Sequence, residues 1–102
     1  MWEIDAVLDL LERHHQRATY GAVARVTGRS AQGVMRDQLP SFRCSWVVAA
    51  KTNLNRGSRR GWPTGYTDNQ IDPICFQQIS ENRNLFICDE TILLNWLNTH
   101  NN

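Results

Sequence analysis

The residues around Cys44 have types suited to covalent chemistry. Cys44 stands between Arg43 and Ser45, at the start of an apolar segment. A cysteine reacts as a thiolate, and a free thiol of pKa about 8.5 is only slightly ionised at neutral pH. Arg43 can favour the thiolate through its charge, but Ser45 cannot remove the proton, and no histidine is adjacent in sequence. This stretch therefore outlines a nucleophilic site that lacks its general base.

The segment before Cys44 has the pattern of a helix-turn-helix, over about residues 19–39. Thr19 is a suitable N-cap for a helix that runs to residue 27, and Gly28 suits the left-handed position that ends it. Ser30 is expected to cap a second helix that ends near residue 39. Small and apolar residues on the inner faces would let the two helices approach closely. These residues are Ala24, Gly28 and Val34.

The basic residues are concentrated in the middle of the chain. The whole sequence of 102 residues has a net charge of only +1. From Arg13 to Arg60, however, there are ten basic residues and one acid, Asp37, which gives a local charge of +9. Both ends of the chain are acidic. This distribution is typical of a surface that contacts a polyanion backbone, and it favours nucleic-acid binding.

The remaining patterns predict one small α+β domain, mostly α, over residues 1–102. Apolar residues at helical spacing indicate a first helix over about residues 4–15, with its histidines exposed at the end. A strand is expected from Cys44, a basic Gly/Ser-rich wing over about residues 51–66, and a short second strand over residues 84–88. Asp89 should cap a final helix, whose apolar stripe includes Trp96. These elements correspond to a winged-helix-like fold.

Three cysteines without a CxxC pair argue against a zinc site or a disulfide framework. They favour reduced thiols in the cytoplasm. No apolar run approaches the length of a membrane span, so no membrane partner is expected, and no motif predicts a cofactor or a metal ion.

Three motifs together resemble a known family. The sequences ATYGAVARVTG, GVM and RCSWVV, with PTGY after them, are similar to the C-terminal DNA-binding domain of O6-alkylguanine-DNA alkyltransferases and of the related alkyltransferase-like proteins. The resemblance covers about residues 18–66. It implies a winged-helix-like fold that binds the minor groove and flips a guanine out of the stack. The family has proline, cysteine, histidine and arginine where this chain has Arg43, Cys44, Ser45 and Trp46, so the activating histidine is missing.

The resemblance also implies roles for individual residues. Tyr20 matches the tyrosine that presses on the phosphate beside the flipped nucleotide. Arg29 matches the arginine that fills the vacated space, if a deletion follows Gly28. The implied base pocket contains Cys44, Trp46 and Tyr66. Together with the charge pattern, this predicts a DNA-contacting set composed of Tyr20, Arg25, Arg29, Ser30, Gln32, Arg36, Arg59 and Arg60.

The sequence therefore favours a non-enzymatic protein that binds double-stranded DNA, intact or damaged, and recognises modified or flipped bases, with a repair protein as a further partner. Three alternatives remain open. The first is a winged-helix regulator that reads undamaged DNA. The second is an active alkyltransferase in which Cys44 accepts the alkyl group, and the third is a protein-interaction module of winged-helix shape.

Overall fold

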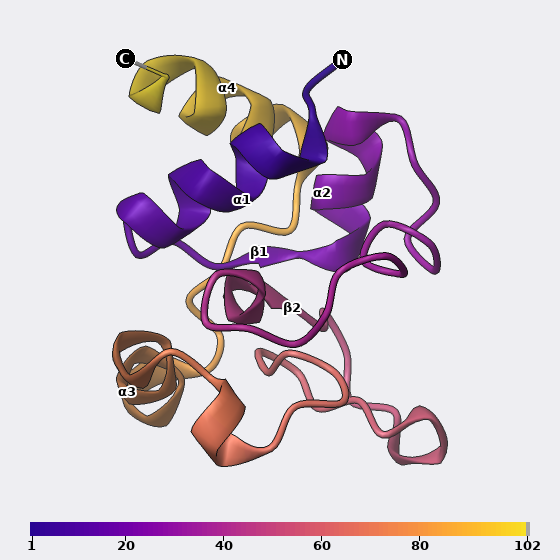
Figure 1. Ribbon diagram of the computed structural model, residues 1–102, viewed down its shortest axis with the longest axis vertical. Helices are drawn as coiled ribbons and strands as arrows, with labels where there is room; N and C mark the ends of the chain where they lie inside the picture. Colours follow the sequence, from indigo (N-terminus) through magenta and orange to yellow (C-terminus); the bar gives the residue numbers. More distant parts are fainter. Residues whose placement is uncertain (102) are drawn as a thin grey trace.

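A computed structural model describes residues 1–101 as a small, mostly α-helical α+β domain (Figure 1). Its longer helices are α1 (Ile4–Arg13), α2 (Tyr20–Thr27), α3 (Pro73–Asn82) and α4 (Glu90–His100). Two-residue strands β1 (Ala18–Thr19) and β2 (Val47–Val48) pair in parallel. Three 3-10 turns complete the regular structure, η1 (Cys44–Trp46), η2 (Leu54–Arg56) and η3 (Asp68–Gln70). The predicted fold class is confirmed at this level.

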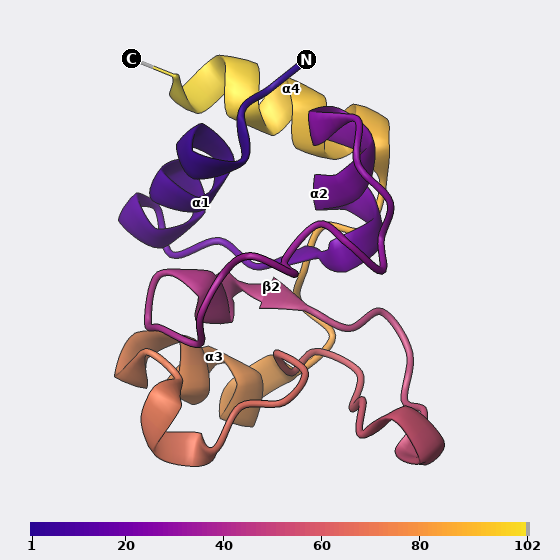
Figure 2. The ribbon, with the colours of Figure 1, turned by 45° about the vertical axis from the view of Figure 1, so that its right-hand side comes forward.

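The short sheet lies between two groups of helices. Helices α1, α2 and α4 pack on one side of it, and α3 lies on the other (Figures 1 and 2). Ala18 of β1 also forms a parallel bridge with Ile87, so three segments of the chain meet there. The buried core is built from the apolar faces of the three upper helices and from η1, and its largest fully buried members include Trp46, Leu8, Leu11, Leu93 and Leu97.

The local signals around α2 act as the sequence predicts. The Thr19 hydroxyl oxygen accepts a hydrogen bond from the Ala22 N–H at 3.1 Å, which caps the helix. Gly28 ends it in the left-handed region, with φ at 71°. Ala24 and Val34 are both buried, as expected for residues at the inner contact. The first half of the predicted helix-turn-helix is therefore confirmed.

Residues 29–38, here called the turn segment, do not form the second helix that the sequence predicts. They form successive turns joined by hydrogen bonds between residues three apart, such as Arg36 N–H to Gly33 O at 3.1 Å. One local cause is visible, because Gly33 disfavours a helix. Ser30 Oγ does accept the Gly33 N–H at 3.1 Å, which is the predicted capping bond, but no α-helix continues from it. Burial of Val34 still anchors the segment to the core.

Residues 49–61, here called the arm, project from the body and carry η2 (rose pink, lower right in Figures 1 and 2). The Gly61 N–H donates to Ala49 O at 2.8 Å and closes the base of the arm. Asn53 and Ser58 exchange two backbone hydrogen bonds of 2.9 Å and close its tip. The arm overlaps most of the region expected as a basic wing, residues 51–66, and hydrogen bonds fix its backbone at both the base and the tip.

Two other predictions need correction. The segment from Cys44 begins as the 3-10 turn η1, and only Val47 and Val48 are extended. The second strand expected over residues 84–88 is reduced to the single bridge at Ile87. Helix α3 was not predicted from the sequence. Its apolar face is short, and only Cys75 and Ile79 of its residues are buried. The final helix begins as predicted, with Asp89 accepting the Ile92 N–H at 3.0 Å.

Candidate nucleic-acid interface

A cavity of about 450 Å³ lies between the turn segment and the arm. Tyr20, at the start of α2, lies on its wall, and Thr64 follows the arm. The turn segment contributes Ala31, Gln32, Met35 and Arg36, and the arm contributes Arg56 and Ser58. This volume falls within the range of small-ligand sites. Two arginines from separate elements, with polar groups beside them, make the cavity suited to an anionic or base-like group.

Tyr20 is fixed in this cavity by its hydroxyl group. The Thr64 N–H donates to the Tyr20 oxygen at 2.8 Å, across 44 residues of sequence. Burial raises the pKa of the Tyr20 hydroxyl, and the Thr64 hydrogen bond offsets part of that rise. Tyr20 is therefore neutral at physiological pH and can donate its own proton to an acceptor. A phosphate oxygen is one such acceptor.

Seven exposed basic residues belong to α2, the turn segment and the arm. Arg59 and Arg60 make contacts within the chain, and the other five are Arg25, Arg29, Arg36, Lys51 and Arg56. The sequence contains no acid between Asp37 and Asp68, so the arm carries no compensating carboxylate. These residues are available to neutralise phosphates.

Other basic residues of the +9 segment are already engaged within the fold. Arg17 is fully buried, and its guanidinium donates to three backbone carbonyl oxygens. Arg43 forms ion pairs with Asp5 at 3.1 Å and Asp9 at 2.8 Å, both on α1. Burial lowers the pKa of Arg43, but the hydrogen bonds to these acids outweigh it and raise the pKa overall. The charge available to a polyanion is therefore smaller than the sequence count.

Arg59 and Arg60, predicted to contact DNA, both make contacts within the chain. Arg59 stacks over the Trp62 ring, with its guanidinium carbon 4.0 Å from the ring centroid. Arg60 donates to Ala50 O at 2.6 Å and to Asn84 Oδ1 at 2.8 Å, which ties the arm to the turn after α3. Arg56, which was not in the predicted contact set, lines the cavity instead. Sequence alone gives no signal that distinguishes these three neighbouring arginines.

Cys44 is buried, with 3% of its surface exposed, and it is not among the residues that line the cavity. Its Sγ donates to Gln38 Oε1 at 3.8 Å. The neighbouring Ser45 hydroxyl is occupied, because it donates to Phe42 O at 2.7 Å and accepts the Asp72 N–H at 3.1 Å. The positive charge of Arg43 is offset by its two carboxylate partners. The thiol therefore has neither a base nor an unpaired cation beside it.

The remaining members of the predicted base pocket lie in different environments. Trp46 is fully buried in the core and stacks on the His15 ring, with centroids 5.5 Å apart, so its predicted place in an open base pocket is wrong. The 3-10 turn η1, which carries Trp46, packs against α1, so the indole belongs to the core. Tyr66 is half-buried, and its hydroxyl accepts the Ser41 N–H at 3.4 Å. Burial raises the pKa of Tyr66 to about 12, despite that bond and with Cys44 and Tyr20 adding to the rise.

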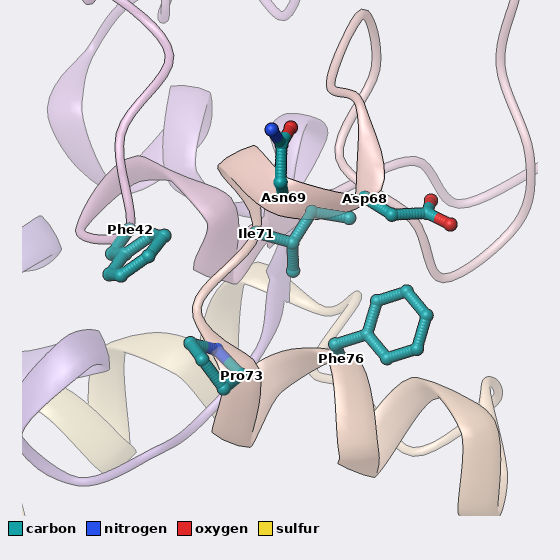
Figure 3. Close-up of a pocket in the computed structure, with 6 residues that line it drawn as sticks. All are labelled: Phe42, Asp68, Asn69, Ile71, Pro73 and Phe76. Atoms are coloured by element: carbon teal, nitrogen blue, oxygen red, sulfur yellow. The ribbon is translucent and has the colours of Figure 1, made fainter.

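A second cavity, of about 420 Å³, has a different chemistry (Figure 3). Figure 3 shows Phe42 and Phe76 on either side of Ile71, with Pro73 below. Asp68 and Asn69 of η3 form its polar edge. Among the described residues that line this cavity, Asp68 alone is charged, and it is an acid. Its carboxylate disfavours a phosphate, so the basic cavity is the better candidate for nucleic acid.

Within residues 1–101, no three His, Cys, Asp or Glu side chains gather as metal ligands. None of the helices in that range is long and apolar enough to span a bilayer. Comparisons with protein-family models, with curated proteins and with solved structures found no match for this chain.

Proposed function

We propose that this chain is a non-enzymatic DNA-binding protein, similar to alkyltransferase-like proteins, that binds duplex DNA and recognises modified or flipped bases. The cavity between the turn segment and the arm is the observation that carries this proposal. Arg36 and Arg56 lie on its wall with Tyr20 and Gln32. Arginines neutralise the backbone, while the tyrosine hydroxyl and the amide offer hydrogen bonds to a phosphate or to a base edge.

The resemblance to alkyltransferases adds the lesion-recognition part of the proposal. Tyr20, which matches the family's phosphate-contacting tyrosine, lies on the cavity wall and is held in place by Thr64. A flipped base beside that phosphate would have a cavity of suitable size to enter. A protein that binds a lesion without removing it needs a second protein for the repair step. We therefore include a repair protein among the partners, and a cytoplasmic location that matches the unpaired cysteines.

The environment of Cys44 supports binding rather than catalysis. Alkyl transfer requires an accessible thiolate, whereas Cys44 is buried and has no base nearby. An active alkyltransferase therefore has little structural support. Residues 31–37 form turns, so the second, recognition helix is absent both for the proposed function and for a winged-helix regulator, and the proposal relies on the cavity instead.

The test compares binding of plain duplex with binding of the same duplex carrying one O6-methylguanine, by fluorescence anisotropy over a range of salt concentrations. We expect binding at low salt that weakens steeply as salt rises, and tighter binding to the lesion duplex. Absence of binding at low salt would overturn the proposal. Equal affinity for both duplexes would remove the lesion part. A stable mass increase on Cys44 in the same samples would instead identify an alkyltransferase.

Arginine variants locate the interface. Arg36→Ala and Arg56→Ala should each weaken binding and reduce the slope of log K against log salt by about one. Arg13→Ala is the matched control, because Arg13 is exposed at the far end of α1, away from the arm (Figure 1). Arg29→Ala tests the residue that would fill the vacated space. It should reduce the preference for the lesion more than the overall affinity.

A further inference from the structure

Leu54 is an apolar side chain at the tip of the basic arm. It opens η2, and 80% of its surface is exposed. The N–H and C=O groups of Asn53 and Ser58 pair across the base of this tip, and Gly57 closes the turn with φ at 69°. The leucine is thus carried on a short backbone loop whose shape is fixed by its own hydrogen bonds. Nothing within residues 1–101 buries it.

The surroundings of Leu54 suit a nucleic acid better than a protein surface or a membrane core. Lys51 and Arg56 flank it, both exposed, and the arm contains no acid. Arg56 also lines the basic cavity, so the tip and the cavity belong to one continuous surface. An exposed leucine is unfavourable in water, and burial of its side chain against an apolar surface is favourable.

We propose that Leu54 is a wedge that inserts between stacked base pairs of the DNA bound at this surface. The inference rests on the proposed function. Proteins that bend or open duplexes use apolar side chains in this way, held beside cations that contact the flanking phosphates. Partial unstacking at the wedge lowers the cost of extruding a neighbouring nucleotide toward the cavity. Leu54 would supply the insertion, and Arg56 would contact the phosphate beside it.

The experiment measures unstacking separately from affinity. Duplexes that carry 2-aminopurine at successive positions are titrated with protein at low salt, and both the fluorescence rise and the anisotropy are recorded. We expect the wild-type protein to raise the fluorescence at one or two neighbouring positions. Leu54→Ala should abolish most of that rise and weaken binding about fivefold, with the salt slope unchanged because no phosphate contact is lost. Leu54→Met should retain the rise.

Ile92→Ala provides the matched control, since Ile92 is 59% exposed on α4, at the opposite end of the molecule from the arm (Figure 1). It should behave as the wild-type protein does. One outcome is that the wild-type protein binds DNA with the expected slope of log K against log salt while Leu54→Ala gives the same fluorescence profile as wild type. That result would overturn the proposed insertion of Leu54 and leave the proposed DNA binding intact. If no duplex binds at low salt, both fail together. A loss with Ile92→Ala equal to that with Leu54→Ala would also overturn the wedge.

Discussion

Replacing Arg17 by methionine tests how the buried guanidinium holds the fold together. Its Nη1 donates to Gly61 O at 3.1 Å and to Arg83 O at 3.3 Å, and its Nη2 donates to Asn82 O at 2.6 Å. Arg17 thereby joins the residue before β1 to the base of the arm and to the end of α3. Burial lowers the pKa of Arg17 from its ordinary value, and its Nε has no hydrogen-bond partner within the described structure.

The expected loss in the free energy of unfolding depends on whether each carbonyl oxygen finds a new hydrogen-bond partner in the Arg17→Met variant. The bond to Gly61 is buried, so methionine leaves that oxygen without a partner, at a cost of about 1–3 kcal/mol. The other two carbonyls are only partly buried, and water can replace the guanidinium at about 0.5–1 kcal/mol each. Relief of the desolvated charge offsets part of this sum. We expect a net loss of about 2–4 kcal/mol.

The assay is equilibrium unfolding in urea, followed by tryptophan fluorescence. Arg17→Met should lower the midpoint with an unchanged m-value, and its Tm should fall by roughly 10–20 °C. Arg17→Lys serves as the comparison, because an ammonium keeps the charge but cannot reach all three oxygens in a fork. Arg17→Lys should lower the free energy of unfolding less than Arg17→Met does. Stability of the methionine variant within about 0.5 kcal/mol of wild type would refute the reasoning.

Two further predictions concern local strain and high pH. Gly61→Ala should destabilise the fold by about 2–4 kcal/mol in urea, because its φ is +83° and a Cβ would clash with the Arg83 carbonyl oxygen. Gly21→Ala, where nothing lies within 4 Å of the new Cβ, should be neutral or slightly stabilising, and an equal loss at both sites would contradict this. Burial raises the pKa of the Cys75 thiol from 9.0 to about 12, so its stabilising contribution is full below pH 9 and is lost as the pH rises toward 12. Between pH 7 and pH 10, the free energy of unfolding should fall by about 1–2 kcal/mol more in the wild-type protein than in Cys75→Ala, because the raised pKa values of Tyr20 and Tyr66 act equally in both proteins. Identical pH dependence in both proteins would count against a buried, neutral thiol.

The sequence predicts those features that depend on neighbouring residues. Thr19 and Gly28 set the limits of α2 through local capping, and Asp89 begins α4 in the same way. The predicted second helix is absent although Ser30 makes its capping bond, and Gly33 is the residue in the segment that most disfavours a helix. Asp72 and Pro73 are also a local signal for the start of a helix, and this signal was sufficient to predict where α3 begins.

Features that depend on contacts between residues far apart in the chain could not be predicted from the sequence. Nothing near Arg17 indicates that its acceptors are the carbonyl oxygens of Gly61, Asn82 and Arg83. Arg43 was considered as a partner for Cys44, yet two acids of α1 hold it. The arm illustrates the same limit, since three arginines of equal chemistry end in three different environments. Their roles are set by which aromatic ring, carbonyl or cavity the folded backbone brings within reach.

The pairing of β1 has a consequence for how the protein folds during synthesis. Ala18 bridges Val47 and also Ile87, and the Thr19 N–H donates to Ile87 O at 2.9 Å. Each contact closes a long loop, so the chain must lose much of its freedom before it gains the pairing. A nascent chain that has emerged only as far as the arm contains Gly61 but lacks Ile87 and the Asn82 and Arg83 carbonyls that Arg17 also binds. The surface proposed for DNA is therefore assembled late, after the residues up to Ile87 have been synthesised.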